Sequence, residues 1–315
     1  MCALTIATRG SKLALWQAEH VKARILELNP LLAEVDLLVL KTKGDKILDV
    51  PLAKIGGKGL FVKEIEEALL DGRADVAVHS IKDVPMTLPP NLALGAIMER
   101  EDARDMFLSM RFANLDALPP GARVGTSSLR RQAGLLRLRP DLAIVPLRGN
   151  VDTRLAKLAA GEFDAVVMAA AGVKRLGLSA PCMVEFPETA MLPAAGQGAL
   201  GLEYRVDDKE VASFLTPLDH EETHLRVMAE RGVLAGLGGG CQTPMAAHAK
   251  VEDGFLVLEA MLVDIDGKRV VRETTRMGAS LGLETAYGLG LGLADKVRRN
   301  GGEELLAELL AAHDQ

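Results

Sequence analysis

The sequence is poor in aromatic residues, in cysteine and in net charge, and each shortage limits what the protein can be. Aromatic side chains make up only 3% of the 315 residues, so the core must be built from Leu, Val, Ala, Ile and Met. The three cysteines, Cys2, Cys182 and Cys241, are too far apart for a disulfide framework or a CxxC metal site, and no metal is expected. A formal net charge of −6 argues against nucleic-acid binding that rests on overall basic character.

Long apolar runs are missing as well. No stretch approaches the ~18 uninterrupted apolar residues of a membrane-spanning helix, and the opening MCALTIATRG lacks the pattern of a signal peptide. Because the cysteine usage suits a reducing compartment, we expect a cytoplasmic protein with no membrane partner. The order GxxxxGK[ST] is also absent, so the glycine-rich stretch KIGGKGLF does not form a phosphate-binding P-loop.

Apolar strands alternate with amphipathic helices over the first two-thirds of the chain. LTIAT, VDLLVL (35–40) and ADVAVHS (74–80) are predicted as strands, and helical patterns follow the first of them and precede the third. Ser11 is expected to cap the first helix, and Gly72 to end the helix over 59–72. This alternation is typical of βαβ units and of largely parallel sheets, which bind ligands beyond the carboxyl ends of their strands.

The last third has a different pattern. A helix is expected from about Asp219 to Leu234, followed by the glycine-rich loop GLGGGCQTP at 236–244. Next comes a pair of strands that turns at Asp266-Gly267, and two helical segments end the chain. The glycines of GLGLGLAD (288–295) do not lead from a strand into a helix, so close helix packing explains them better than dinucleotide binding. Together these features indicate a separate α+β domain.

Cationic and hydroxyl side chains gather in four strand-to-helix turns of the first two-thirds. The turns are Thr8 to Ser11, His79 to Asp83, Thr126 to Arg131, and Arg148 to Arg154. Arginine near a helix N-terminus opposes the helix dipole by roughly 0.3–1 kcal/mol. Four such placements therefore favour an anionic ligand, whether a phosphate or several carboxylates. For any single arginine, a solvated or ion-paired surface position remains an alternative.

Two further residues have competing interpretations. Asp83 follows Lys82 and is either a salt-bridged or capping aspartate, or a carboxylate that stabilises a cation formed during a reaction. Cys241 is a small buried thiol, a nucleophile, or the attachment point of a prosthetic group for which the neighbouring glycines leave room. The residues alone leave these alternatives open.

Eight segments give the chain a resemblance to the porphobilinogen deaminase (hydroxymethylbilane synthase) family. In order they are ATRGSKLALWQA, GGKGLFVKEIE, AVHSIKDVP, GTSSLRRQ, LRGNVDTRL, AAAGVKRLG, PAAGQGALGLE and GGGCQTP. The resemblance implies a transferase of haem and porphyrin biosynthesis. Such an enzyme adds four porphobilinogen units, each with an acetate and a propionate, to a covalent dipyrromethane cofactor. It then releases the linear tetrapyrrole hydroxymethylbilane by hydrolysis.

The resemblance also implies roles for individual residues. Cys241 would carry the dipyrromethane through a thioether, and Asp83 would be the catalytic residue. Contacts to the cofactor would come from Ser80, Lys82, Thr126, Ser128, Arg130 and Arg131. Contacts to the substrate carboxylates would come from Arg9, Ser11, Arg148, Arg154 and Arg175. Lys54 and Lys58 would lie on an active-site loop.

The fold implied by the resemblance has two α/β domains, similar to the halves of periplasmic-type binding proteins, and a smaller α+β C-terminal domain. The expected boundaries are 1–98 with 198–216, then 99–197, then 217–315, with the cofactor loop at 236–244. Such proteins are typically monomers, and their product passes to a downstream tetrapyrrole enzyme. The chain departs from the family pattern at Tyr204, Gly238 and Thr243, so the resemblance does not imply how the residues around the loop pack.

Two functions of other classes remain open at the level of sequence. A non-catalytic anion-binding protein of the same two-lobed architecture would bind carboxylates without a covalent group on Cys241. A cysteine-based acyl-transfer or redox enzyme would instead keep a reactive thiol there.

Overall fold

A computed structural model describes residues 2–46, 62–239 and 243–313. The chain divides into two compact units. Unit 1 comprises residues 1–50, 58–101 and 199–224, and unit 2 comprises 51–57, 102–198 and 225–315. Lys54, Lys58 and Cys241 lie outside the described residues, and the three-domain division implied by the resemblance stays a prediction.

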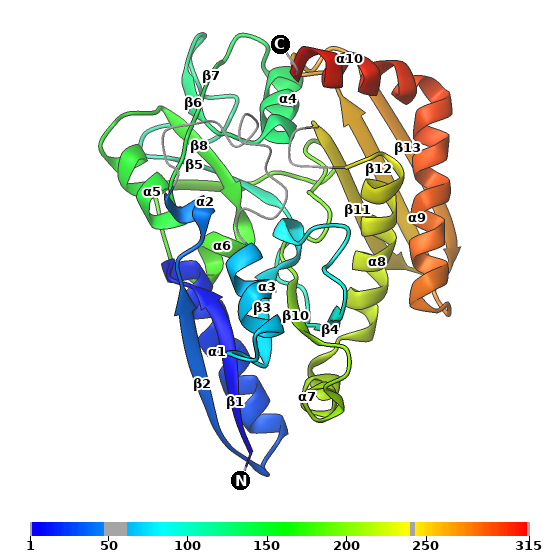
Figure 1. The fold of residues 1–315 in the computed structure, drawn as a ribbon. Helices are drawn as coiled ribbons and strands as arrows, with labels where there is room; N and C mark the ends of the chain where they lie inside the picture. Colours follow the sequence, from blue (N-terminus) through cyan, green and yellow to red (C-terminus); the bar gives the residue numbers. More distant parts are fainter. Residues whose placement is uncertain (1, 47–61, 240–242, 314–315) are drawn as a thin grey trace. The chain divides into compact units, whose positions relative to one another are not determined.

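Unit 1 is built on a five-stranded sheet with the strand order β2-β1-β3-β10-β4 (Figure 1). Its elements are β1 (Cys2–Arg9), α1 (Lys12–Leu28), β2 (Leu32–Leu40), α2 (Lys43–Lys46), α3 (Lys63–Leu70), β3 (Val76–Ser80), the 3₁₀ turn η2 (Ile81–Asp83), β4 (Leu92–Ile97), β10 (Leu200–Arg205), α7 (Lys209–Leu215) and the 3₁₀ turn η3 (Thr216–Leu218). β1 pairs in parallel with β2 and β3, whereas β10 runs antiparallel to β3 and β4. The expected largely parallel sheet is confirmed, with one reversed strand.

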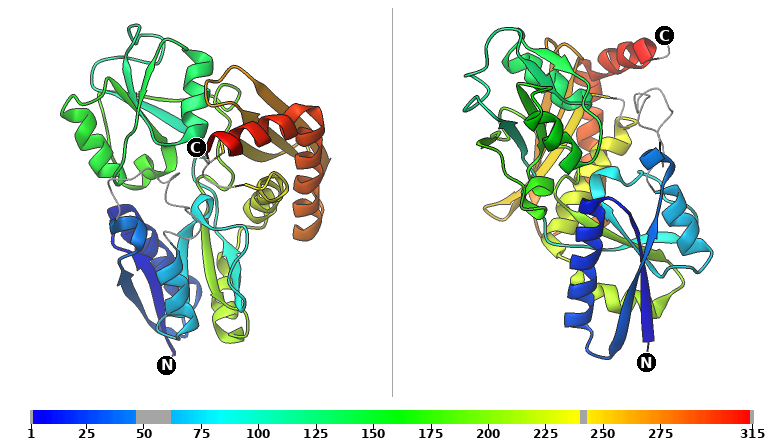
Figure 2. Two further views of the ribbon diagram at one scale, coloured as in Figure 1. Left: turned by 45° about the horizontal axis from the view of Figure 1, so that its top comes forward. Right: turned by 90° about the vertical axis from the view of Figure 1, so that its left-hand side faces the viewer.

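Helices cover both faces of this sheet, as the right-hand view of Figure 2 shows for α1 and α3. Val21 and Ile25 of α1 pack with Ile6 of β1 in one core cluster, and Leu69 of α3 packs with Ala7 in another. Because successive side chains of a strand point to opposite faces, neighbouring residues of β1 serve the two layers.

The predicted ends of these helices are confirmed. The Ser11 hydroxyl accepts a hydrogen bond from the Ala14 amide at 3.2 Å and so caps α1. After α3, Gly72 adopts a φ of 70°, the left-handed conformation that glycine takes without a steric penalty. Both signals lie within a few residues of the helix end that they mark, so they are readable from sequence.

Unit 2 begins with a second five-stranded sheet, ordered β7-β6-β8-β5-β9. Its elements are β5 (Asp105–Ser109), β6 (Arg123–Gly125), α4 (Leu129–Leu138), β7 (Ala143–Val145), α5 (Val151–Ala159), β8 (Ala165–Ala169), α6 (Ala170–Arg175) and β9 (Cys182–Glu185). β6 pairs in parallel with β7 and β8, and β5 runs antiparallel to β8 and β9. Each five-stranded sheet thus has one reversed strand, fourth in its order, which confirms the expected pair of similar α/β folds.

The C-terminal part of unit 2 is a three-stranded antiparallel sheet with helices on one face. Its elements are α8 (Glu221–Gly236), most of which belongs to unit 2, β11 (Met245–Glu252), β12 (Phe255–Val263), β13 (Val270–Gly278), α9 (Leu283–Val297), the turn η4 (Arg298–Gly302) and α10 (Glu303–His313). The turn between β12 and β13 contains Gly267 at a φ of 73°, as predicted. The two faces of β12 contribute to different core clusters. Leu258 on one face packs with residues of α8 and α9, and Met261 on the other face packs with Ala133 of α4. The smaller α+β part is therefore confirmed, and one face of its sheet packs on helix α4 of the second α/β fold.

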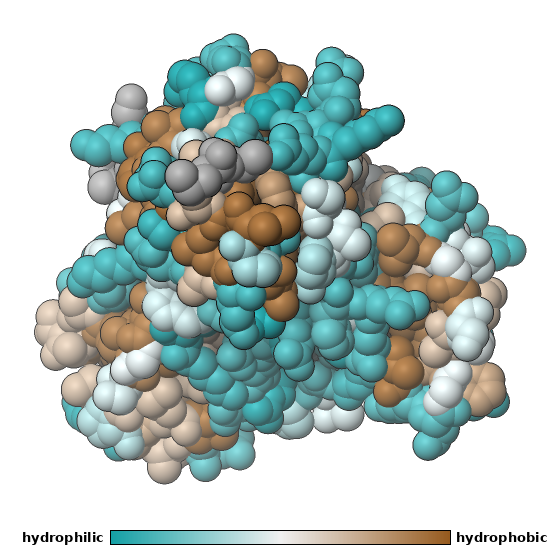
Figure 3. Space-filling model, turned by 90° about the horizontal axis from the view of Figure 1, so that it is seen from below, coloured by the Kyte–Doolittle hydropathy of each residue, from teal (hydrophilic) through white to brown (hydrophobic). Residues whose placement is uncertain are grey.

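On the face drawn in Figure 3, hydrophilic residues are interspersed with separate apolar patches. Within the described ranges, none of the helices has the length and apolar character needed to cross a membrane.

Candidate functional site

In unit 1, the first cluster of predicted residues lies where β1 leads into α1. Arg9 is the last residue of β1 and is half-buried. Ser11 caps the helix, and the hydroxyl of the buried Thr8 donates to the carbonyl of Ala14 at 3.1 Å. The Ser11 oxygen already accepts the Ala14 amide, yet its own proton can still be donated to a ligand. The turn is thus held by its own hydroxyl groups, with Arg9 at its entrance.

The second cluster follows β3, in the one-turn helix η2. Lys82 and Asp83 are exposed, whereas Ile81 between Ser80 and Lys82 is only 1% exposed. The Ile81 amide donates to the carbonyl of Ala199 at 3.0 Å, which ties the turn to the segment entering β10. The Ser80 hydroxyl accepts a hydrogen bond from the Gln17 amide at 3.1 Å. The Asp83 carboxylate is therefore solvent-accessible, while the preceding residues Ser80 and Ile81 are held by hydrogen bonds to Gln17 and Ala199.

Behind this turn lies a buried group of titratable side chains. His79 Nε2 lies 2.8 Å from Glu203 Oε2, and both side chains are almost fully buried. Burial raises the pKa of Glu66 above its usual value; the Glu203 carboxylate raises it further, and His79 opposes both effects. The strand that ends at the Asp83 turn is consequently pinned to β10 by a charged or strongly polar contact.

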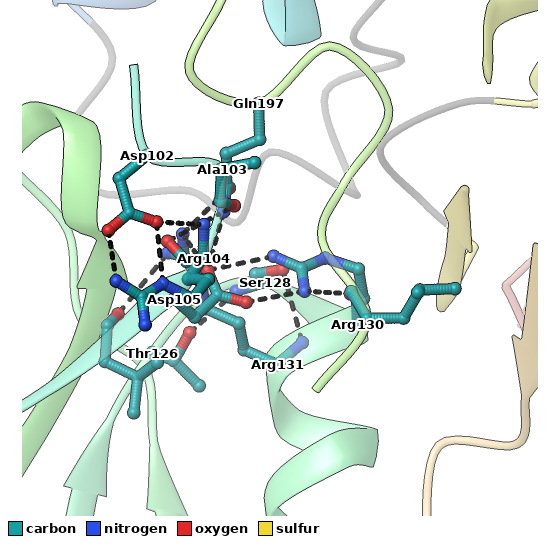
Figure 4. Close-up of polar contacts among 11 residues, drawn as sticks. Asp102, Ala103, Arg104, Asp105, Thr126, Ser128, Arg130, Arg131 and Gln197 are labelled. Carbon is teal, nitrogen blue, oxygen red and sulfur yellow. Dashed lines mark hydrogen bonds and ion pairs between the residues drawn. The ribbon is translucent and has the colours of Figure 1, made fainter. Parts of the chain in front are cut away.

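In unit 2, Arg130 and Arg131 converge on one carboxylate, that of Asp105 (Figure 4). Arg130 Nη1 donates to Asp105 Oδ2 at 2.6 Å and its Nη2 to Oδ1 at 3.1 Å, while Arg131 Nε donates to Oδ1 at 2.9 Å. Each arginine is 6% exposed and Asp105 is fully buried. Of the two structural alternatives for these arginines, the ion pair is correct and the solvated surface position is wrong.

Two positive charges face the buried carboxylate of Asp105. Burial alone would raise the pKa of Asp105, but the charges of Arg130 and Arg131 outweigh it and hold the pKa well below its usual range. Two guanidinium groups therefore share one carboxylate. Gln197 completes the cluster, because its Nε2 donates to Asp105 Oδ1 at 3.0 Å and its Oε1 lies 3.4 Å from Arg131 Nη2.

The hydroxyl groups predicted beside these arginines order the first turn of α4. Thr126 Oγ1 accepts the Ser128 amide at 3.2 Å, and Ser128 Oγ accepts the Arg131 amide at 3.4 Å as the helix cap. Because a hydroxyl that accepts one hydrogen bond can still donate another, both retain a possible donor.

The remaining predicted arginines of unit 2, Arg148, Arg154 and Arg175, are half-buried, and two of them are bound to backbone carbonyls. Arg154 Nε donates to the carbonyl of Gly149 at 2.8 Å, and Arg175 Nη2 donates to the carbonyl of Gly198 at 2.7 Å. Gly149 has a φ of 114°, and a Cβ there would come within 2.8 Å of Thr153, so the turn that carries Arg148 requires glycine.

A second acid-base cluster lies next to the first but at the surface (Figure 4). Asp102 accepts two hydrogen bonds from the Arg104 guanidinium, at 2.9 and 2.7 Å, one from the Arg104 backbone amide at 3.0 Å, and one from Lys174 at 2.5 Å. The hydrogen bond from Arg104 is the largest cause that lowers the pKa of Asp102. The two cations are each about 40% exposed, in contrast to the buried pair on Asp105.

The sequence interpretation missed Asp105 and Gln197. Asp105 opens a strand of buried residues, DMFLS, where an acid is unexpected, and Gln197 lies in the matched segment PAAGQGALGLE. An acid at the start of an apolar strand was the available signal. Across the described parts of the chain, no group of three His, Cys, Asp or Glu side chains could hold a metal ion.

Comparison with known proteins gives matches along nearly the whole chain. Residues 4–213 match the family described as porphobilinogen deaminase, dipyromethane cofactor binding domain, and residues 224–299 match the porphobilinogen deaminase C-terminal domain. A porphobilinogen deaminase from Nitratidesulfovibrio vulgaris (strain DP4) is 60% identical over 312 residues, covering 98% of this chain and 97% of that protein. The one from Lawsonia intracellularis is 55% identical over 307 residues, covering 97% and 98%. The one from Chromobacterium violaceum is 52% identical over 308 residues, covering 98% of each.

Proposed function

The chain belongs to the porphobilinogen deaminase family, and we propose how its residues divide the work of the family's reaction. The activity is that of a hydroxymethylbilane synthase, a transferase of tetrapyrrole biosynthesis that uses a dipyrromethane cofactor. It adds four porphobilinogens to this cofactor and releases the linear product by hydrolysis. The observation that carries this conclusion is 60% identity over 98% of the chain, together with both family domains.

The arginine cluster of unit 2 fits a group that bears carboxylates. Arg130 and Arg131 both donate to the Asp105 carboxylate, which brings two guanidinium groups together at the start of α4. A dipyrromethane has carboxylate groups that such arginines can bind. It also has the free pyrrole carbon at which the chain grows. We assign its binding to Arg130 and Arg131, helped by the hydroxyls of Thr126 and Ser128 in unit 2 and by Ser80 and Lys82 in unit 1.

Asp83 is the proposed catalytic residue. Loss of ammonia from porphobilinogen creates positive charge on the pyrrole, and an oriented carboxylate stabilises that charge. After the new carbon–carbon bond forms, a carboxylate oxygen of Asp83 can assist removal of the proton from the attacking pyrrole. The hydrogen bond of Ile81 to Ala199 supports this role, because it fixes the backbone from which Asp83 projects.

The substrate carboxylates are assigned to Arg9, Ser11, Arg148, Arg154 and Arg175. Their positions support the assignment, since Arg9 ends β1, Arg148 follows β7 and Arg154 lies in the first turn of α5. The anchoring of Arg154 and Arg175 to carbonyls holds each guanidinium in one orientation, which suits recognition of a planar carboxylate.

Cys241 is proposed as the thioether attachment point and Lys54 and Lys58 as parts of an active-site loop, on the strength of the matched segments GGGCQTP and GGKGLFVKEIE. We further propose that the enzyme works in the cytoplasm as a monomer and passes its product to another tetrapyrrole enzyme. The absence of a disulfide framework among three scattered cysteines supports the compartment.

Intact mass of the purified protein tests the attachment directly. We expect a mass above the 33.6 kDa of the sequence by one dipyrromethane, and loss of the excess in Cys241→Ser. An unmodified mass in fully active protein would remove the covalent cofactor from Cys241. A carboxylate-binding protein or a free-thiol enzyme would also show the unmodified mass.

The role of Asp83 is tested separately with Asp83→Asn, which keeps the shape and removes the charge. We expect the variant to carry the cofactor and bind substrate but to turn over at least about a hundredfold more slowly. Turnover close to that of the unaltered enzyme would exclude Asp83 from the mechanism.

A further inference from the structure

Glu230 of α8 is fully buried and has no part in the roles assigned above. Its Oε2 accepts the amide of Gly196 at 2.7 Å, and its Oε1 accepts the amide of Ala249 at 2.8 Å. A buried carboxylate that uses both oxygens on backbone amides of two distant segments is a rigid connector, because losing either bond leaves a buried group unsatisfied.

Glu230 and one of its two amide partners lie on the elements that flank the proposed cofactor loop. α8 ends at Gly236, immediately before the loop, and β11 begins at Met245, immediately after it. Glu230 lies on the first of these elements and Ala249 on the second. One carboxylate therefore ties together both flanks of the segment that contains Cys241.

The other amide partner of Glu230, Gly196, lies in the segment 192–198, which also contacts arginines of unit 2. The carbonyl of Leu192 accepts Arg130 Nη1 at 2.8 Å, and the carbonyl of Gly198 accepts Arg175 Nη2 at 2.7 Å. Between them, Gln197 binds Asp105 and lies beside Arg131. Gly196 and Gly198 have φ values of 69° and 89°, so the course of the segment depends on glycine.

A second tie runs parallel to the first. Glu188, just before this segment, lies 3.1 Å from His248 Nε2 and forms an ion pair with Lys250, and both partners belong to β11. His248 Nδ1 in turn lies 3.4 Å from Glu230 Oε1. β11 is thus linked to the segment around 188–198 by two carboxylates. Glu188 contacts His248 and Lys250 of β11, and Glu230 joins Ala249 of β11 to Gly196.

We propose that Glu230 is a positioning residue for chain growth. It sets the flanks of the cofactor loop in register with the segment 192–198, and through that segment with Arg130, Arg131 and Arg175. The inference rests on the proposed attachment at Cys241 and on the proposed role of these arginines. If the primer is tethered by its sulfur and held by its carboxylates, the distance between the two restraints decides where its reactive carbon lies, and small errors in position reduce rate strongly.

The test is Glu230→Gln in the holoenzyme, with turnover expressed per primed molecule and the primed fraction taken from intact mass. Glutamine keeps the shape but turns an amide NH₂ toward one of the two backbone amides. We expect kcat per primed molecule to fall about ten- to a hundredfold with a smaller change in KM. Glu221→Gln, on the exposed start of the same helix, is the matched control and should leave kcat unchanged.

A purely structural role for Glu230 would lower the thermal midpoint and the yield of primed enzyme but leave kcat per primed molecule within about twofold of the unaltered enzyme, and that result overturns the proposal. If Glu230→Gln does not fold, kcat per primed molecule is measured in Gln197→Met instead. This substitution removes the contacts of Gln197 with Asp105 and Arg131 and so breaks the same connection between Glu230 and the arginines. Unaltered turnover per primed Gln197→Met molecule would equally overturn it.

The double variant sharpens the test. If both residues act through one connection, the two losses in kcat overlap, so that the double variant is little worse than the poorer single one. Losses that simply multiply would show separate roles and refute the connection. Failure of the proposed function is a different observation, since the unaltered protein would then carry no dipyrromethane mass at all.

Discussion

The buried carboxylate of Asp105 offers a quantitative prediction about stability. In Asp105→Asn, one oxygen remains to accept a hydrogen bond, but an NH₂ group replaces the other and faces a guanidinium NH of Arg130 or Arg131. Asp105 is fully buried and each arginine is only 6% exposed, so water cannot replace the lost partner. Removing one member of a buried ion pair costs about 3–5 kcal/mol.

This free energy corresponds to a fall of about 6–20 °C in the thermal midpoint of unit 2, at about 2–4 °C per kcal/mol for a unit of this size. Because the folded-state pKa of Asp105 is lowered, its contribution is present above the unfolded-state pKa of about 3.9 and is lost as pH falls through the folded-state value. Scanning calorimetry at neutral pH therefore measures the full effect, and the two proteins should converge only in strong acid.

Asp102→Asn is the matched control for this experiment. Asp102 also contacts two cations, Arg104 and Lys174, but these are each about 40% exposed. Water can solvate them after the substitution, so the expected loss is about 1 kcal/mol or less. If Asp105→Asn loses no more stability than Asp102→Asn, burial does not decide the cost of the unpaired charge, and the expected difference is wrong.

Two other predictions concern the C-terminal part of unit 2. Gly290→Ala should lower the free energy of unfolding in urea by about 1–3 kcal/mol or more, since its Cβ would lie 2.1 Å from the Ala229 carbonyl oxygen. Gly288→Ala, whose Cβ would meet nothing within 4 Å, should raise that free energy by about 0.5–1 kcal/mol. Equal effects of the two substitutions would contradict close packing of α8 and α9. The His248 hydrogen bond lowers the pKa of Glu188 to about 2 from 4.5, so the stability it adds is present above about pH 4.5 and lost toward pH 2. In Glu188→Gln the thermal midpoint should fall less steeply over that acid range, and an unchanged slope would show that the tie adds nothing.

Features set by neighbouring residues could be predicted from sequence. The cap at Ser11, the helix end at Gly72 and the turn at Gly267 each depend on a few adjacent residues, and the structure has all three. The packing interpretation of residues 288–295 is confirmed for Gly290, which lies against α8, but does not extend to Gly288 or Gly292, where a Cβ would meet nothing within 4 Å. Spacing identified the helix, but the partner helix decides which glycine is needed.

Partners of the charged residues could not be predicted. Arg130 and Arg131 stood out in the sequence as cations at a helix start, yet Asp105 reaches them because β5 runs antiparallel beside β8. Glu230 gave no signal at all, since an acid within an amphipathic helix normally faces water. Such pairings join residues far apart in the chain, and local patterns carry no information about them. Where Cys241 lies relative to these groups stays a prediction.

The reversed strand β10 has a consequence for how the protein is made. It lies between β3 and β4, so β3 lacks one of its two neighbours and β4 lacks its only neighbour until the ribosome has produced the whole of residues 102–198. The sheet of unit 1, which begins the chain, is therefore completed only after the residues of the second sheet have been made. Until then, one side of β3 is an unpaired edge. The bond from Ile81 to Ala199 forms only with this return, so the turn that carries Asp83 is among the late features to become ordered. A nascent or truncated chain that stops before β10 should accordingly possess the residue proposed for catalysis without the backbone that orients it.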